Sequence, residues 1–197
     1  LVKRKIKGFF FPSGKAAMEN IVLDINLIHA IQSKSISDVD LYNDLNFLLI
    51  QNNFKEKDLK VFKKYFFYKS RYDSCFIRYF KEVLQNMKNL DIKNKILELL
   101  FKKYVDMEER LFSKLLYLST SDIKELLNNK MYVGGHGYEH LRLANQNKVK
   151  QNRDINKTIN FLSKMGAPTK NWIMCYPFGS YNLDTIKILK KKIALQV

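Results

Sequence analysis

The chain has 197 residues, a formal net charge of +16 at pH 7 and 46% hydrophobic residues, which is enough apolar material for a domain with a sizeable core. No run of roughly eighteen apolar residues occurs, so the sequence predicts no transmembrane helix. Two cysteines, Cys75 and Cys175, are too few for a disulfide framework, so a reducing compartment and a cytoplasmic location are expected.

The first predicted elements are one strand and a series of helices. Lys5–Gly14 contains three consecutive phenylalanines and is interpreted as a strand. Downstream, no glycine or proline occurs from Lys15 to Tyr132, which favours helices joined by short polar segments. Apolar residues recur there with helical spacing in four segments, 39–50, 59–66, 76–84 and 96–104.

This helical region suggests the organisation of the chain. We interpret 31–118 as an α-helical insertion, which separates a first part of a domain at 1–30 from a second part at 119–197. Two roles remain open for the insertion. It is either a lid or wall that selects the substrate, or an addition without a role in the site.

The high positive charge admits nucleic acid or another anionic partner. The densest basic segment, Lys55–Arg71, interleaves lysines with aromatic residues, a pattern that can stack on and neutralise a nucleic-acid strand. The same pattern is typical of an amphipathic helix with buried rings and solvated lysines. We favour the amphipathic helix, because the segment has no named nucleic-acid-binding signature. A basic helical nucleic-acid-binding module is kept as an alternative.

A capped helix and a short strand follow the helical region. Ser119–Asp122 has the sequence of a helix N-terminus, with a hydroxyl N-cap and an acidic residue three positions later. The apolar run Met131–Val133 predicts a strand. Two glycines come directly after it and permit close approach of the backbone and positive φ.

Two of the three histidines, His136 and His140, follow these glycines. Four residues are slightly more than one helical turn, so both imidazoles can face the same point. Neutral imidazole is the commonest protein ligand of zinc and similar ions, although such a pair also occurs by chance on solvated helices. The pattern is not H-E-x-x-H, because Glu139 stands beside the second histidine, so a metalloprotease is not indicated. A catalytic zinc usually has three protein ligands, so a carboxylate must come from elsewhere.

The C-terminal part predicts three further elements. Asp154–Lys164 is expected to be a helix that ends at a glycine. Trp172–Asn182 is interpreted as a strand and tight turn in which Asn182 caps the next helix, and α/β folds place ligand sites at such junctions. An ordinary buried strand and turn is the alternative. Cys175 is expected to be a small core residue rather than a nucleophile. The final run, Lys192–Val197, is predicted to be a strand.

Three segments, in this order, carry a family resemblance. Lys5–Gly14 resembles an A-T-F-F-V-like strand. Tyr117–Leu126 and the strand that follows it resemble the helix and strand leading into an H-[ST]-x-x-H-type metal motif at the two histidines. Tyr176–Asn182 resembles an R-x-P-Y-G turn with a trailing S-x-N. Together they resemble the polysaccharide deacetylases of the NodB-homology type, carbohydrate esterase family four.

The resemblance implies an α/β fold, a partial distorted (β/α) barrel of the NodB type with a large α-helical insertion. It implies metal-dependent removal of an N-acetyl group from an N-acetylated sugar, sugar nucleotide or glycan, for example a bacterial surface glycan. His136 and His140 would bind the metal, expected to be zinc, with cobalt, nickel or manganese as alternatives. The backbone N–H of Phe178 matches the family's oxyanion donor. The implied substrate-binding residues are Tyr176, Pro177, Tyr181 and Asn182.

The chain departs from the family pattern in four places. The T-F-D-D motif, which supplies the base and the third metal ligand, is expected upstream of Lys5. A leucine–histidine pair that carries the general acid is expected beyond Val197, so the base and the acid would lie outside this chain. Cys175 stands in place of the motif's arginine, and Gly137 in place of the usual hydroxy residue. The alternative to an enzyme is therefore a degenerate, non-catalytic carbohydrate-binding domain.

Overall fold

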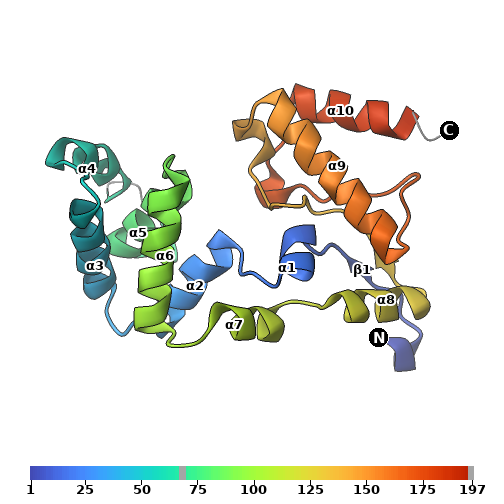
Figure 1. Cartoon of the computed structure of the whole chain (residues 1–197), viewed down its shortest axis with the longest axis horizontal. Helices are drawn as coiled ribbons and strands as arrows, with labels where there is room; N and C mark the ends of the chain where they lie inside the picture. Colours follow the sequence, from blue (N-terminus) through green and yellow to red (C-terminus); the bar gives the residue numbers. More distant parts are fainter. Residues whose placement is uncertain (67–69, 195–197) are drawn as a thin grey trace. The chain divides into compact units, whose positions relative to one another are not determined.

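The computed structural model describes residues 1–66 and 70–194, which divide into two compact units (Figure 1). The first unit combines Leu1–Ile21 with Glu109–Val197, and the second is Val22–Glu108. The first unit contains the elements η1 (Val2–Arg4), β1 (Phe9–Phe10), α1 (Gly14–Glu19), α7 (Glu109–Leu116), α8 (Thr120–Asn128), β2 (Tyr132–Val133), η3 (Leu143–Asn145), α9 (Lys148–Met165), η4 (Pro177–Gly179) and α10 (Leu183–Ala194). The second contains α2 (Asp24–Lys34), α3 (Asp38–Gln51), α4 (Glu56–Lys63), η2 (Lys64–Phe66), α5 (Cys75–Asn86) and α6 (Leu90–Tyr104).

A short parallel ladder connects distant segments of the first unit. β1 pairs with β2 in parallel, with Phe9 opposite Tyr132 and Phe10 opposite Val133. Just beyond β2, Gly135 forms an isolated parallel bridge with Met174, which lies two residues before the Tyr176–Asn182 segment. The strands expected near residues 9 and 132 are confirmed, although each spans only two residues. The chain has mixed but mainly helical content, and the partial distorted (β/α) barrel stays a prediction.

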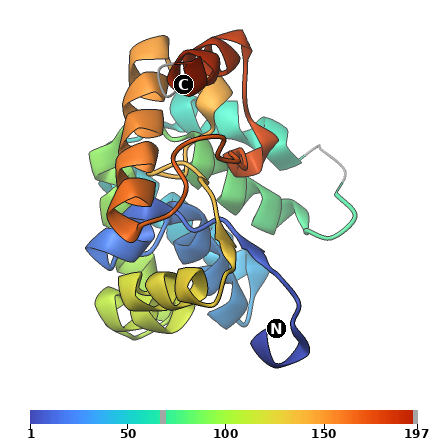
Figure 2. The same ribbon diagram turned by 90° about the vertical axis from the view of Figure 1, so that its right-hand side faces the viewer.

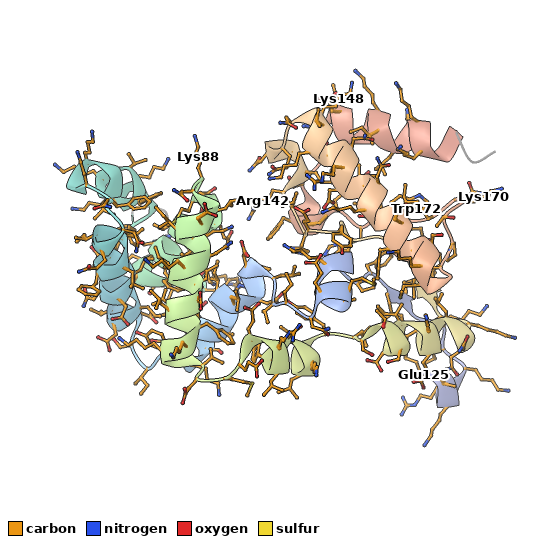
Figure 3. The ribbon with its side chains drawn as sticks, in the orientation of Figure 1. Lys88, Glu125, Arg142, Lys148, Lys170 and Trp172 are labelled. Carbon is orange, nitrogen blue, oxygen red and sulfur yellow. The ribbon has the colours of Figure 1, made fainter. Side chains whose placement is uncertain are left out.

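Helices provide most of the core of the first unit. α9 contacts α1, α8 and α10, and it lies beside α10 in both ribbon views (Figures 1 and 2). Trp172, labelled in Figure 3, is buried among these elements. The largest apolar side chains of this core are Ile123, Val133, Ile155, Phe161, Leu162, Met165, Trp172, Ile188 and Leu189.

Side-chain caps define the helix ends much as the sequence indicates. Ser119 and Asp122 form the expected capping box at the start of α8. Gly166 ends α9 in the left-handed conformation with φ of 80°, where glycine avoids the Cβ clash. α9 begins at Lys148, six residues before the expected start, because Asn147 caps it by accepting a hydrogen bond from the N–H of Lys150.

One predicted strand is wrong. Lys192–Val197 was expected to be extended, but α10 continues to Ala194, and 195–197 lie outside the described residues. The lysines at positions 190 to 192 continue the polar face of α10, and helical spacing of Ile186 and Leu189 extends into this run. The two β-branched residues of this run, Ile193 and Val197, favour a strand less strongly than the preceding apolar spacing favours a helix.

The second unit consists of helices among its described residues. α3, α4, α5 and α6 confirm the four helices expected from the apolar spacing. Leu41, Leu45 and Leu49 of α3 are fully buried, and α3 packs mainly against α5. Phe66 packs edge-to-face with Tyr42, at a ring-centroid distance of 5.3 Å. This supports the amphipathic interpretation of the basic aromatic segment, part of which, residues 67–69, lies outside the described residues.

In the described part of the chain, no helix is both long enough and apolar enough to cross a bilayer.

Substitution of Gly135 can test how closely side chains pack against the ladder. A Cβ at this position would lie 2.4 Å from Cζ3 of Trp172 and 2.8 Å from Cγ2 of Thr158. We therefore expect Gly135→Ala to lower the free energy of unfolding of the first unit by about 1–3 kcal/mol, because the core must shift to admit the methyl group. Urea unfolding followed by the fluorescence of the single tryptophan measures this.

The matched control is Lys187→Ala on the exposed face of α10, which should change stability by less than about 0.5 kcal/mol. Equal stability of the Gly135→Ala variant and the parent would contradict the packing around Trp172.

Candidate functional site

The two histidines lie on a loop between β2 and η3, and not on a helix. Their imidazole rings nevertheless converge, with centroids 4.9 Å apart and planes inclined at 66°. The helical argument for their convergence is therefore wrong in its cause, because a turn of the loop brings the rings together. This geometry is compatible with both rings facing one ion.

Positive backbone angles produce this turn. Gly137 has φ of 70° and His140 has φ of 54°, both in the left-handed region. A Cβ at Gly137 would lie 3.1 Å from Oδ2 of Asp154 and 3.2 Å from Cγ of Pro177. Both the conformation and the lack of space explain why glycine stands where the family pattern has a hydroxy residue.

His136 is oriented by the neighbouring segment of the ladder. Its Nδ1 lies 2.8 Å from the carbonyl oxygen of Cys175, a distance at which a protonated Nδ1 donates a hydrogen bond. This tautomer leaves Nε2 as the nitrogen for a metal, the arrangement usual for metal-bound histidines. The side chain of Cys175 is exposed, so its expected place in the core is wrong. The backbone of this residue, and not its thiol, contacts the site.

His140 lies in a more enclosed, aromatic environment. Its ring is 4.8 Å from the ring of Phe178, and the guanidinium carbon of Arg142 lies 4.2 Å from the same phenyl ring. Burial, assisted by the nearby charges of His136 and Arg142, lowers the pKa of His140 to about 4. A neutral imidazole is the form that binds metal, so this environment favours ligation.

The turn that follows Met174 supplies the other expected residues. Pro177 is buried, and Phe178 has φ of 58°, an uncommon conformation for a residue with a side chain. No group in the described part of the chain accepts a hydrogen bond from the N–H of Phe178. Tyr176 and Tyr181 stack with centroids 4.8 Å apart and an interplanar angle of 26°. Tyr181 is 51% exposed and presents an aromatic face beside the turn.

The amide of Asn182 is engaged within the protein. Its Oδ1 accepts the N–H of Thr185 at 3.1 Å, which confirms Asn182 as the cap of α10. Its Nδ2 lies 3.4 Å from the carbonyl oxygen of Ala144, and the buried Gln151 contacts the same amide. Asn182 therefore joins the turn to the loop that follows the histidines.

The sequence predicts Asp154 only as the start of a helix, so this residue of the site is one that sequence reasoning misses. This residue is 2% exposed, and its carboxylate accepts hydrogen bonds from the N–H groups of Tyr138 and Glu139. Burial raises the pKa of Asp154, and these two hydrogen bonds oppose the shift. The signal that could have identified it is its helical spacing from Thr158 and Phe161, four and seven residues later, which places it on the buried face of α9.

Within residues 1–66 and 70–194, no three histidine, cysteine, aspartate or glutamate side chains are grouped as a metal site. His136 and His140, whose rings lie close together, are therefore a pair of candidate ligands. Their chemistry fits a divalent ion such as zinc, because the contact of His136 Nδ1 with the Cys175 carbonyl leaves Nε2 available, and burial favours the neutral imidazole of His140.

The surroundings of His140 predict its titration in the metal-free protein. Its imidazole should titrate near pH 4, whereas the unfolded chain takes up that proton near pH 6.5. Between these values the unfolded state binds more protons, so the contribution of His140 to stability is complete above pH 6.5 and is lost as the pH falls toward 4. Arg142→Gln should raise the pKa of His140, because it removes a nearby positive charge.

Nitrogen-15 NMR of the three histidine side chains, assigned with His→Gln variants, gives these pKa values. A His140 resonance that titrates at its ordinary pH would contradict the buried position.

The family is established by comparison with known proteins. The sequence model described as polysaccharide deacetylase matches residues 71–194, which include both histidines and the turn at Tyr176–Asn182. The match begins before α5 and does not include β1. No curated protein and no solved structure matches the chain. Because the family match covers more than half of the sequence, the chain belongs to the polysaccharide deacetylase family.

Proposed function

We propose that the protein hydrolyses the N-acetyl group of an N-acetylated sugar, sugar nucleotide or glycan, and releases acetate and the free amine. Membership of the family supports the reaction class, since these domains act on acetylated carbohydrates. The observation that carries the proposal is the convergence of His136 and His140 beside the Phe178 turn. The two imidazole centroids are 4.9 Å apart, and the ring of His140 is 4.8 Å from the ring of Phe178. Acetamide hydrolysis needs an activated water and a stabilised oxyanion, and this arrangement suits both.

His136 and His140 would hold a divalent metal, for which zinc is the first candidate and cobalt, nickel or manganese are alternatives. When bound, such an ion polarises a carbonyl oxygen and lowers the pKa of its water to about 7. The carbonyl oxygen of Cys175 fixes the tautomer of His136, and burial keeps His140 neutral. No residue of this sequence is assigned as the general base or general acid.

The turn contributes to substrate binding in this proposal. The backbone N–H of Phe178 would donate to the oxyanion that forms as water adds to the acetyl carbonyl. The stacked pair of Tyr176 and Tyr181 offers an apolar face to a sugar ring, and Pro177 and Asn182 hold this turn in place. Cys175 has no guanidinium and so cannot replace the arginine of the family motif. It contacts His136 through its backbone carbonyl instead.

The histidines should be essential for turnover. We expect His136→Ala and His140→Ala to lower acetate release by the full-length protein more than about 100-fold, because the loss of a ligand lowers the affinity for the metal. Acetate is measured with zinc or cobalt present, across N-acetyl sugars and sugar nucleotides. His29→Ala is the matched control, because this third histidine belongs to the second unit.

Full activity of His136→Ala in the presence of a chelator would rule out the proposed reaction. Sugar binding without acetate release on any substrate would favour the alternative, a non-catalytic carbohydrate-binding domain.

Tyr181 tests the sugar-binding face separately from the chemistry. Tyr181→Ala should raise KM roughly two- to tenfold, since an aromatic stack contributes about 0.5–1.5 kcal/mol. Its kcat should change little, because the contact is made equally in the ground and transition states. Tyr181→Phe keeps the ring and should retain the parent KM. A loss of kcat in both variants, with KM unchanged, would contradict this role.

A further inference from the structure

α9 carries a charged residue on its buried face. Asp154 is 2% exposed, and Thr158 and Phe161, which lie four and seven residues further along this face, are also buried. A carboxylate that is removed from water is strongly unfavourable unless it is well hydrogen-bonded. The hydrogen bonds of Asp154 therefore decide whether the fold can hold a carboxylate at this position.

Both oxygens of Asp154 bind the histidine loop. Oδ1 accepts the N–H of Glu139 at 2.8 Å, and Oδ2 accepts the N–H of Tyr138 at 3.2 Å. These two backbone groups directly precede His140 in the sequence. Hydrogen bonds to a carboxylate are roughly twice as strong as neutral ones, and their strength increases away from water.

The same loop residue is held on its other side. The carbonyl oxygen of Tyr138 accepts hydrogen bonds from Oγ of Ser13 at 2.8 Å and from the N–H of Lys15 at 2.9 Å. Its hydroxyl donates to Oε1 of Glu19 at 2.9 Å. Tyr138 is therefore fixed by α1 and its preceding residue through the carbonyl and side chain, and by α9 through the N–H.

This fixation matters because the next turn is strained. His140 has φ of 54°, and a left-handed conformation of a residue with a side chain costs on the order of 1–3 kcal/mol. Such a conformation persists only where surrounding contacts determine it. The two N–H groups that donate to Asp154 lie one and two residues before His140.

We propose that Asp154 is a positioning residue, which sets the distance between the imidazoles of His136 and His140 by holding the loop backbone from α9. It acts on peptide N–H groups and not on an imidazole nitrogen. The proposal rests on the proposed function in one respect, namely that the two histidines bind a metal. The effect of Asp154 on the loop backbone does not depend on that metal.

A second link between α9 and this loop provides a matched control. Glu139 forms an ion pair with Lys157 of α9, with Nζ and Oε1 2.7 Å apart, and both side chains are partly exposed. Exposed ion pairs of this kind contribute about 0–1 kcal/mol. Glu139→Gln therefore removes a contact between the same two elements without touching the buried carboxylate.

The test compares Asp154→Asn, Glu139→Gln and Thr158→Val in the full-length protein. The side-chain amide that Asp154→Asn introduces would present an NH₂ group to one of the two loop N–H groups, so one hydrogen bond is lost with little change in volume. Thr158→Val perturbs the buried face of α9 beside Asp154, because its hydroxyl donates to the Asp154 carbonyl at 2.8 Å. It serves as the control for a purely structural effect on the helix.

Two measurements distinguish the outcomes. The first is hydrogen exchange at the Tyr138 and Glu139 amides in the metal-free protein. Its rate should rise at least about tenfold in Asp154→Asn, because the hydrogen bonds to the buried carboxylate protect these amides. In the two controls the rate should change little. The zinc dissociation constant, from calorimetry, should rise about 10- to 100-fold in Asp154→Asn only.

Unchanged exchange at both amides in Asp154→Asn would overturn the proposal. Faster exchange with the parent's zinc affinity would overturn the link to the histidine pair. The same loss of affinity in Thr158→Val would also overturn it, because general destabilisation of α9 would then suffice. If the parent protein binds no metal, the proposed function fails, and the exchange measurement alone decides the role of Asp154 in the loop.

Discussion

The parallel backbone ladder through β1, β2 and Met174 is the constraint on which the candidate site depends. The N–H of Gly135 donates to the carbonyl of Ile173, and the N–H of Cys175 donates to the carbonyl of Gly135. These two bonds place the Cys175 carbonyl beside His136, where it fixes the imidazole. A ladder of short strands suffices for this, because Trp172 packs tightly against Gly135 and admits little sliding.

The loop after the ladder combines conformational strain with many hydrogen bonds. Gly137 and His140 both have positive φ, and the peptide groups between them are held by Asp154. Phe178 also has positive φ, and its ring contacts both His140 and Arg142. Left-handed residues at a ligand site are typical of structures in which surrounding contacts fix a functional geometry. The loop backbone adopts locally unfavourable angles, and in this conformation the two imidazole rings lie close together.

Much of this arrangement could be predicted from the sequence, and the remainder depended on contacts between distant segments. Periodicity identified α3, α4, α5 and α6 of the second unit but not α2, and capping chemistry identified the starts of α8 and α10. Spacing alone suggested that His136 and His140 converge, but it assigned the cause to a helix. The Cys175 carbonyl contacts the imidazole of His136, 39 residues away in sequence, and the Asp154 carboxylate accepts from backbone N–H groups 15 and 16 residues away. No local pattern encodes such partners.

Zinc K-edge X-ray absorption of the zinc-loaded full-length protein tests the central claim most directly. The account predicts imidazole scattering from two ligands at about 2.0–2.1 Å in the parent protein. The scattering should fall to one imidazole in His140→Ala and should be unaffected in His29→Ala. A zinc spectrum without imidazole scattering, or one that His136→Ala and His140→Ala both leave unchanged, would contradict the assignment of this histidine pair as the metal ligands.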